Sequence, residues 1–402
     1  MAPTSTIPVI DINASHLSRS EIARSLAEAA IEHGFVYIRN NSDIDIPASD
    51  IDAAFDLSKK LFVGTSVEEK QKCAIGTNNR GWSGMHSETL DPKNQRVGDF
   101  KEAFNFGPFP TPTTPSQSLP PTIHPALTPQ ISLFRTKCHT LCLRLLHLFG
   151  EGLEVSPPSY FADSHDPARE SGTILRHLYY PPVIKSSPAA AAAAAAENDG
   201  SSEEGGNDIR AGAHSDYGSV TLLFRLRGQP GLEVLTRSNE WVPVPVAPEG
   251  TENDPSPPIL VNIGDLLSYW TGGLLRSTVH RVVFPSSSSS SSSSSTTTST
   301  SSPSSATNGN GTATVAGETD TSSPRYSIAF FCHPAGDTEL GAVPSERVKK
   351  HVSAREGRGK AEVGGPGVKN PYAERRVVTA DEHLQMRLRA SYLALYNADE
   401  TA

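Results

Sequence analysis

The sequence has few cysteines, and their spacing suggests neither a disulfide framework nor a zinc site. The 402 residues contain four cysteines, and no two of them form a CxxC pair. They are Cys73, Cys138, Cys142 and Cys332. The N-terminus also lacks a charged start followed by an apolar run, which is the pattern of a secretory signal. We therefore expect a reduced, intracellular protein and assign it to the cytoplasm.

Two further absences exclude classes of partner. No apolar stretch approaches the ~18 residues of a membrane-spanning helix. The net charge is −9, and no strongly basic block occurs. The basic stretch 347–360 is interrupted by Glu356 and two glycines, and we predict a solvated loop there. Because the electrostatic footprint of nucleic-acid binding is missing, we expect neither a nucleic acid nor a membrane as a partner.

Apolar residues make up 36% of the chain, which is low for a globular domain. The deficit is concentrated in two low-complexity tracts. Residues 186–207 join a run of alanines to an acidic Gly/Ser segment, and residues 286–323 are rich in Ser and Thr. Neither tract can bury enough apolar surface to offset the entropy lost on ordering. We predict that both are disordered loops projecting from the folded core.

The remaining sequence divides into segments of different periodicity. These are a mixed helix and strand N-terminal region at 5–110, a Pro/Thr/Ser-rich connecting loop at 111–128, a long amphipathic helix and loop at 129–172, repeated short strands at 173–340, and a loop and final helix at 341–402. Thr379 and Glu382 form a predicted capping box for that helix. Short strands in succession indicate a double-sheet jelly roll. The predicted fold is mixed α+β, with a jelly-roll (double-stranded β-helix) core, flanking helices and an N-terminal α/β region.

A metal site is indicated by His214 and Asp216 in the predicted strand 211–217. Residues two apart point to the same side of a strand. His280, on another predicted strand, can supply a third ligand. Two imidazoles and one carboxylate form the facial triad of non-haem Fe(II) oxygenases, which leaves the opposite face of the metal open. A buried His–Asp pair without a metal is the alternative interpretation.

An anion site is indicated by the predicted strand 325–331. Alternation places Arg325 and Ser327 on one face, together with Phe331. A buried guanidinium is costly unless an anion meets it. It binds a carboxylate in bidentate fashion, and a nearby hydroxyl adds a donor. A core Asp or Glu is the alternative partner for Arg325.

The order of these motifs resembles the 2-oxoglutarate/Fe(II)-dependent dioxygenases of the isopenicillin N synthase-like family. The resemblance covers nearly the whole chain outside the two tracts. In the N-terminal region it is carried by Ile7–Asp11, Gly34–Tyr37, Arg80–Trp82 and Asp99–Phe104. In the core it is carried by His214-x-Asp216, Gly231-Leu232, Asn262–Asp265, His280–Val282 and Arg325-x-Ser327.

The resemblance implies roles for individual residues. His214, Asp216 and His280 would hold Fe(II), and Arg325 with Ser327 would bind the distal carboxylate of 2-oxoglutarate. Tyr180 matches a tyrosine that often contacts this co-substrate, although Leu178 stands where many relatives have Asn. Tyr217 and Phe331 are expected to line the pocket. Ordinary core packing is the alternative for each of these three aromatic residues.

The resemblance further implies an oxidoreductase, a 2-oxoglutarate-dependent dioxygenase that uses Fe(II), 2-oxoglutarate and O₂. Ascorbate is a candidate reductant. We expect oxygenation of a small organic molecule in specialised metabolism, with hydroxylation as the default and desaturation or ring closure as variants. The substrate, the regiochemistry and the oligomeric state are not specified by the sequence.

Three other functions fit parts of the pattern. A same-fold Fe(II) oxidase that does not use 2-oxoglutarate would bind a substrate carboxylate at Arg325, and succinate production separates it from a dioxygenase. A non-catalytic small-molecule-binding protein on this scaffold would not need a complete triad. A zinc hydrolase also accepts two His and a carboxylate, but no general base is marked and the Arg-x-Ser pair is left unexplained.

Overall fold

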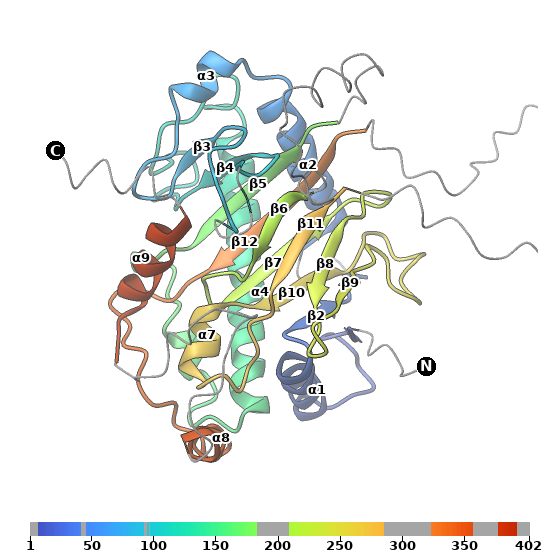
Figure 1. Ribbon diagram of the computed structural model, residues 1–402, viewed down its shortest axis with the longest axis vertical. Coiled ribbons are helices and arrows are strands. Elements are labelled where there is room, and N and C mark those ends of the chain that lie inside the picture. The colour runs from blue at the N-terminus through green and yellow to red at the C-terminus, as the bar shows by residue number, and fades with distance from the viewer. Residues whose placement is uncertain are drawn as a thin grey trace, which may run out of the picture.

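The computed structural model describes residues 7–41, 46–91, 95, 97–182, 209–284, 323–356 and 377–391. The tracts predicted to be disordered, 186–207 and 286–323, lie outside the described residues except for Ser323. In the described part, two β-sheets are surrounded by helices (Figure 1). The prediction of a mixed α+β protein is confirmed.

Among the described residues, the larger sheet has eight strands in the order β1-β2-β10-β7-β12-β5-β4-β3, and the smaller has four in the order β6-β11-β8-β9. The strands of the larger sheet are β1 Val9–Ile10, β2 Phe35–Ile38, β3 Gly81–Ser83, β4 Glu102–Phe106, β5 Ile174–Tyr180, β7 Val220–Arg225, β10 Ile259–Ile263 and β12 Arg325–Cys332. Those of the smaller sheet are β6 Ile209–His214, β8 Leu232–Leu235, β9 Trp241–Pro243 and β11 His280–Val283.

The described helices lie outside the sheets or at their ends. They are α1 Arg19–Glu32, α2 Ala48–Phe62, α3 Val67–Gln71, α4 Thr128–Gly152, α5 Tyr160–Asp163, α7 Asp265–Trp270, α8 Glu346–Glu356 and α9 Ala380–Ser391. The long helix α4 runs behind the larger sheet (Figure 1), where Phe134 packs on Phe224 of β7. The helix α1 begins at Ser18, whose hydroxyl accepts from the Glu21 N–H while the Glu21 carboxylate accepts from the Ser18 N–H. This reciprocal pair fixes the start of α1.

The alternation of side chains along β12 separates two apolar layers. Ile328 and Phe330 belong to the main core, together with α4 residues such as Leu145. Ala329 belongs to a second cluster with Leu178 of β5 and residues of the smaller sheet. The inward-facing residues of the larger sheet therefore line the space between the two sheets.

Strands of the N-terminal region complete both ends of the larger sheet. β2 pairs antiparallel with β10, with Val36 opposite Val261, and β4 pairs antiparallel with β5, with Ala103 opposite Leu178. The N-terminal region and the strand-rich core thus share one sheet, although nothing in their sequences marks this pairing.

Two local predictions differ from the structure, and one is confirmed by it. The predicted strand 211–217 is displaced, since β6 covers Ile209–His214. The prediction of a solvated loop at 347–360 is wrong as far as Glu356, because α8 covers Glu346–Glu356. Arg347 donates to the Gly152 carbonyl (2.8 Å) and pairs with Glu28 (2.5 Å), which anchors α8 to two other helices. The Thr379–Glu382 capping box of α9 is confirmed.

No helix in the described segments is long and apolar enough to cross a membrane.

Candidate active site

The three predicted metal ligands converge at one end of the space between the sheets. One ligand atom from each of His214, Asp216 and His280 lies within 4.8 Å of the other two. The Oδ1 atom of Asp216 is 3.9 Å from Nε2 of His214 and 3.7 Å from Nε2 of His280. Among the described residues, these three make the one such group of His, Cys, Asp and Glu ligands.

The chain brings these ligands together differently from the predicted alternation along one strand. His214 ends β6 and His280 begins β11, and the two residues are paired in the antiparallel ladder. Asp216 lies beyond the end of β6, where its carbonyl accepts a hydrogen bond from the N–H of Asp265 at the start of α7 (2.7 Å). The three residues lie close together, as the prediction requires, but Asp216 is positioned by a loop that α7 holds and not by the strand.

Hydrogen bonds on the far side of each ligand orient it. Nδ1–H of His214 donates to the Gly212 carbonyl (2.7 Å), and Nδ1–H of His280 donates to the Thr278 carbonyl (3.1 Å). Both Nε2 atoms therefore face the centre. The Oδ2 atom of Asp216 accepts from the Thr221 hydroxyl (2.7 Å) and the Asn262 amide (2.6 Å), and Oδ1 is left for the centre. Such outer partners are typical of metal ligands.

The charges of the triad also suit a divalent cation. Burial, assisted by the neighbouring His280, lowers the pKa of His214 to about 4. Burial raises the pKa of Asp216, but the two imidazoles and the hydrogen bonds from Asn262 and Thr221 outweigh it, and the net shift is downward. At neutral pH the site offers imidazole and carboxylate in the protonation states that bind metal. This donor set is typical of non-haem iron.

Arg325 is buried at the other end of the same cavity. Its Nε–H donates to the Pro230 carbonyl (3.1 Å), and its guanidinium lies over the Tyr180 ring, 4.8 Å from the ring centroid. Nη1 has no hydrogen-bond partner, and no described carboxylate forms an ion pair with Arg325. Burial lowers the pKa of the guanidinium. A buried cation in this state fits an anionic ligand that enters the cavity.

All the residues predicted for the site line this one cavity. They are His214, Asp216, His280, Arg325, Ser327, Tyr180, Tyr217 and Phe331. In the ladder between β5 and β12, Tyr180 lies opposite Arg325 and Leu178 lies opposite Ser327. Leu178 therefore gives this part of the cavity an apolar wall.

A second buried arginine was missed by the sequence analysis. The guanidinium carbon of Arg210 lies 4.5 Å from the centroid of the Phe284 ring and 6.0 Å from the centroid of the Tyr180 ring. No described carboxylate pairs with it, and its Nε has no hydrogen-bond partner. Burial first, and then the nearby Arg325, lowers the pKa of Arg210 to about 10. Its position directly after the acidic tract made it indistinguishable from loop sequence.

A buried cluster of charged residues was also missed. Lys101 pairs with Asp99 and with Glu88 (2.9 Å), and Arg176 holds Glu88 through both terminal nitrogens (2.5 and 3.2 Å). Lys101, Glu88 and Arg176 line the cavity. This cluster joins the N-terminal region to β5. The motif that includes Asp99 and Lys101 was noted as a family marker, but its spacing alone carried no sign of the distant partner Arg176.

Comparison with known families matches two parts of the chain. Residues 7–130 match the N-terminal family described as "non-haem dioxygenase in morphine synthesis N-terminal". Residues 171–301 match the 2OG-Fe(II) oxygenase superfamily. The second match includes all three triad residues.

Relatives agree with these matches. UPF0676 protein C1494.01 of Schizosaccharomyces pombe is 36% identical over 69% of this chain and 76% of its own length. Proline hydroxylase buaE of Petromyces alliaceus is 30% identical over 64% of this chain and 76% of its own length. The fold is similar to that of a full-length Neurospora crassa protein solved in complex with alpha-KG and 5-formyluracil, with a TM-score of 0.64, 23% identity, and coverage of 97% of this chain and 98% of that one. Oxygenases of this superfamily have a jelly-roll core, so the similar fold confirms the jelly-roll prediction.

The chain therefore belongs to the 2OG-Fe(II) oxygenase superfamily, and it is a 2-oxoglutarate-dependent dioxygenase that uses Fe(II).

Proposed function

We propose that His214, Asp216 and His280 bind the Fe(II), and that Arg325 with Ser327 and Tyr180 binds the distal carboxylate of 2-oxoglutarate. One observation carries this proposal: the guanidinium of Arg325 is buried without a carboxylate partner in the cavity that also contains the triad. A dicarboxylic acid with a 2-keto group can meet both ends of such a cavity. When bound, iron and 2-oxoglutarate supply the activation of O₂ for oxidation of a C–H bond.

The protein's own contribution is orientation and exclusion of water. Asn262 and Thr221 hold Asp216 so that Oδ1 faces the imidazoles. Apolar side chains on the cavity wall, such as Leu223 and Phe331, limit the water around the reacting groups. Hydroxylation is the expected outcome, with desaturation or ring closure as variants that depend on the substrate.

We further propose a small organic molecule of specialised metabolism as the substrate. One matched family is described by its place in morphine synthesis, and one relative is named a proline hydroxylase. The cavity combines apolar walls with the charged cluster around Lys101. It suits a compact molecule with both apolar and polar parts.

The test is anaerobic titration of the Fe(II)-loaded protein with 2-oxoglutarate, followed by the weak visible absorption band of the iron chelate. The wild type is compared with Arg325→Met, His214→Ala and the control Arg281→Met, whose guanidinium faces Glu233 and Trp241. We expect the band to form in the wild type and the control, to need more 2-oxoglutarate in Arg325→Met, and to be absent in His214→Ala.

Two results would contradict the proposal. If iron binds equally well to His214→Ala, the ligand assignment is wrong. If Arg325→Met and Arg281→Met have the same affinity for 2-oxoglutarate, the distal carboxylate binds elsewhere. Succinate formed in step with product, measured by chromatography after substrate screening, checks that 2-oxoglutarate is consumed in the reaction and that the substrate does not supply all four electrons.

A further inference from the structure

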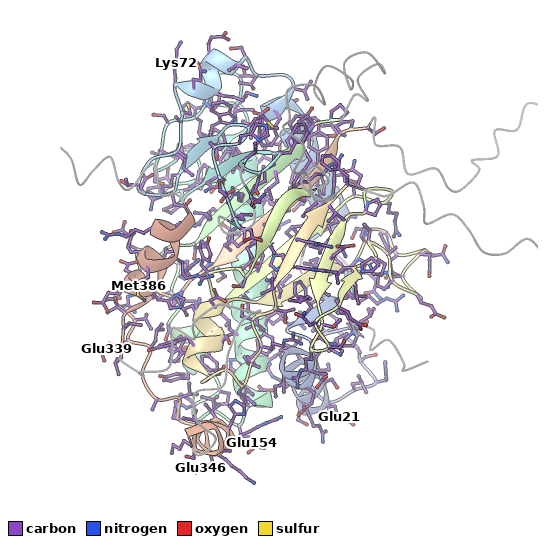
Figure 2. The ribbon with its side chains drawn as sticks, viewed as in Figure 1. Glu21, Lys72, Glu154, Glu339, Glu346 and Met386 are labelled. Atoms are coloured by element: carbon purple, nitrogen blue, oxygen red, sulfur yellow. The ribbon has the colours of Figure 1, made fainter. Side chains whose placement is uncertain are left out.

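The last described helix, α9, forms a wall of the active-site cavity. Leu384 and Leu388 are buried and line the cavity that contains the triad. They make a small apolar cluster with Ile75 and Tyr217, separate from the two larger clusters. Met386, labelled on the outer side of α9 in Figure 2, is 56% exposed. One face of α9 thus belongs to the cavity, and the opposite face to solvent.

Arg387 connects this wall to the loop that carries two proposed metal ligands. Its Nη2 lies 2.7 Å from Oδ2 of Asp265 and 3.3 Å from the Ser215 hydroxyl. Its guanidinium also lies over the Tyr217 ring, 5.1 Å from the centroid. Ser215 and Tyr217 flank Asp216 in the chain. Arg387 therefore touches the metal loop, residues 214–217, on both sides of its carboxylate ligand.

Asp265 links Arg387 to the proposed metal ligand Asp216. Its side chain is 8% exposed. Oδ2 also accepts from the Ser215 hydroxyl (3.0 Å), and Oδ1 accepts from the Ser277 hydroxyl (2.6 Å). Its N–H donates to the Asp216 carbonyl. A buried carboxylate that loses its cation is left poorly compensated, so removal of the Arg387 charge should disturb the residue that supports the metal loop.

The start of α9 is held independently of Arg387. The N–H groups of Ala380 and Asp381 donate to the carbonyls of Thr338 (2.9 Å) and Gly336 (3.0 Å), and the capping box adds two further bonds. Farther along, His383 packs near Tyr269 of α7, with ring centroids 5.9 Å apart. The first turn is thus an anchor, while the second half of α9 is held to the rest of the protein through Arg387 and Leu388.

We propose that Arg387 is a positioning residue, which locks the α9 wall and the metal loop together through its ion pair with Asp265. The inference rests on the proposed function in one respect, because it takes residues 214–217 as the iron-binding loop. With the wall locked to the loop, a substrate that packs on Leu384 and Leu388 is placed at a fixed position relative to the metal ligands.

The test is amide hydrogen exchange of the full-length protein, with peptides that cover 214–217, 264–268 and 380–391. The variant is Arg387→Met, which keeps the length of the stem and removes the charge. Arg389→Met is the matched control, because Arg389 is an exposed arginine on the same helix. Arg387→Lys keeps the charge without the planar guanidinium. Anaerobic titration with Fe(II) alone is the second readout.

We expect Arg387→Met to raise exchange on the order of tenfold in the second half of α9 and also at 214–217 and 264–268. We expect it to weaken Fe(II) binding by roughly tenfold, with Arg387→Lys intermediate and Arg389→Met unchanged. Unchanged exchange in α9 would overturn the proposal. Faster exchange in α9 alone, with the loop and Fe(II) affinity unchanged, would also overturn it, because Arg387 would then only pack the helix.

Failure of the two proposals can be told apart. A wild type that does not bind Fe(II) contradicts the proposed function, whereas the exchange comparison still decides whether Arg387 couples α9 to residues 214–217. If Arg387→Met does not fold, Arg387→Lys carries the same comparison against Arg389→Met.

Discussion

His214 and His280 face each other across the ladder between β6 and β11, with ring centroids 4.4 Å apart and ring planes at 54°. Both belong to the smaller sheet. The residues that hold the third ligand, Thr221 and Asn262, belong to β7 and β10 of the larger sheet. The proposed iron site therefore joins the two sheets at one point. Its affinity for Fe(II) depends on Thr221 and Asn262, although neither side chain is a proposed metal ligand.

Removing the outer support of Asp216 should weaken metal binding without removing a ligand. Asn262→Ala and Thr221→Val each take away one of the two donors to Oδ2. We expect each to lower Fe(II) affinity by about 10–100-fold, measured by anaerobic titration. Asn40→Ala is the control, because that amide is also buried and bonded but lies in a loop, where its partners are the Ile46 carbonyl and the Ser256 hydroxyl. Equal affinities in all three variants would contradict the assignment.

The charged cluster of Glu88, Lys101 and Arg176 in the cavity wall should matter for stability. Glu88→Gln leaves Lys101 and Arg176 buried without their shared carboxylate. Removal of one partner from a buried ion pair typically costs about 3–5 kcal/mol, and we expect a loss of that order in the free energy of unfolding in urea. Glu346→Gln is the comparison, and Figure 2 labels Glu346 at the edge of the molecule. Its carboxylate pairs with Lys349 and is 86% exposed, so the change should affect stability little. A Glu88 variant as stable as the Glu346 variant would show that the cluster is dispensable for folding.

Stability should also fall in mild acid, in part because of His177. Burial lowers the pKa of His177 from 6.5 to about 3. The unfolded chain therefore takes up this proton first, so the stability from His177 is complete above pH 6.5 and is lost as the pH falls toward 3. Between pH 7 and pH 5 this residue should account for a loss of about 2 kcal/mol.

The contribution of His177 can be isolated by comparing urea unfolding of the wild type and His177→Gln at both pH values. The variant should lose less stability than the wild type on acidification, even if it is less stable at pH 7. Equal losses in the two proteins would mean that His177 does not stay neutral in the folded state.

A further prediction concerns the second buried arginine. The positive charge of Arg210, near Tyr180 and Arg325, should favour the distal carboxylate of 2-oxoglutarate. We expect Arg210→Met to lower affinity for 2-oxoglutarate on the order of tenfold in the anaerobic titration. The same variant should bind 2-oxobutanoate, which lacks the distal carboxylate, as the wild type does. A similar loss for both compounds would indicate damage to the metal end of the cavity and not a missing charge.

The parts of the site that the sequence could predict are those encoded by local pattern. The Arg-x-Ser alternation on β12 follows from periodicity within a few residues, whereas the HxD pair and His280 were predicted from residue type and from the resemblance. The structure places all of them on one cavity. Local pattern likewise predicts the capping box of α9, where Thr379 and Glu382 satisfy each other over three residues.

The features that were missed depend on contacts between residues far apart in the chain. Asp216 is held by Asp265, Glu88 by Arg176, and α8 by Glu28 through Arg347. In each case the partner lies 49 or more residues away, and one sequence does not show which of many residues it will be. The position of β6 was misjudged for the same reason, because its end is set by α7 and by pairing with β11.

The pairing of β2 with β10 and of β4 with β5 has a practical consequence for anyone who wishes to produce the iron-binding part alone. A fragment that begins at residue 171, where the superfamily match starts, would lack β1–β4 and also α4. The hydrogen-bonding edges of β5 and β10 would then be open, and the apolar outer face of the sheet would be uncovered. Open edges of this kind template intermolecular strand addition. Such a fragment should form insoluble aggregates on expression, and the minimal folded enzyme must include the N-terminal region.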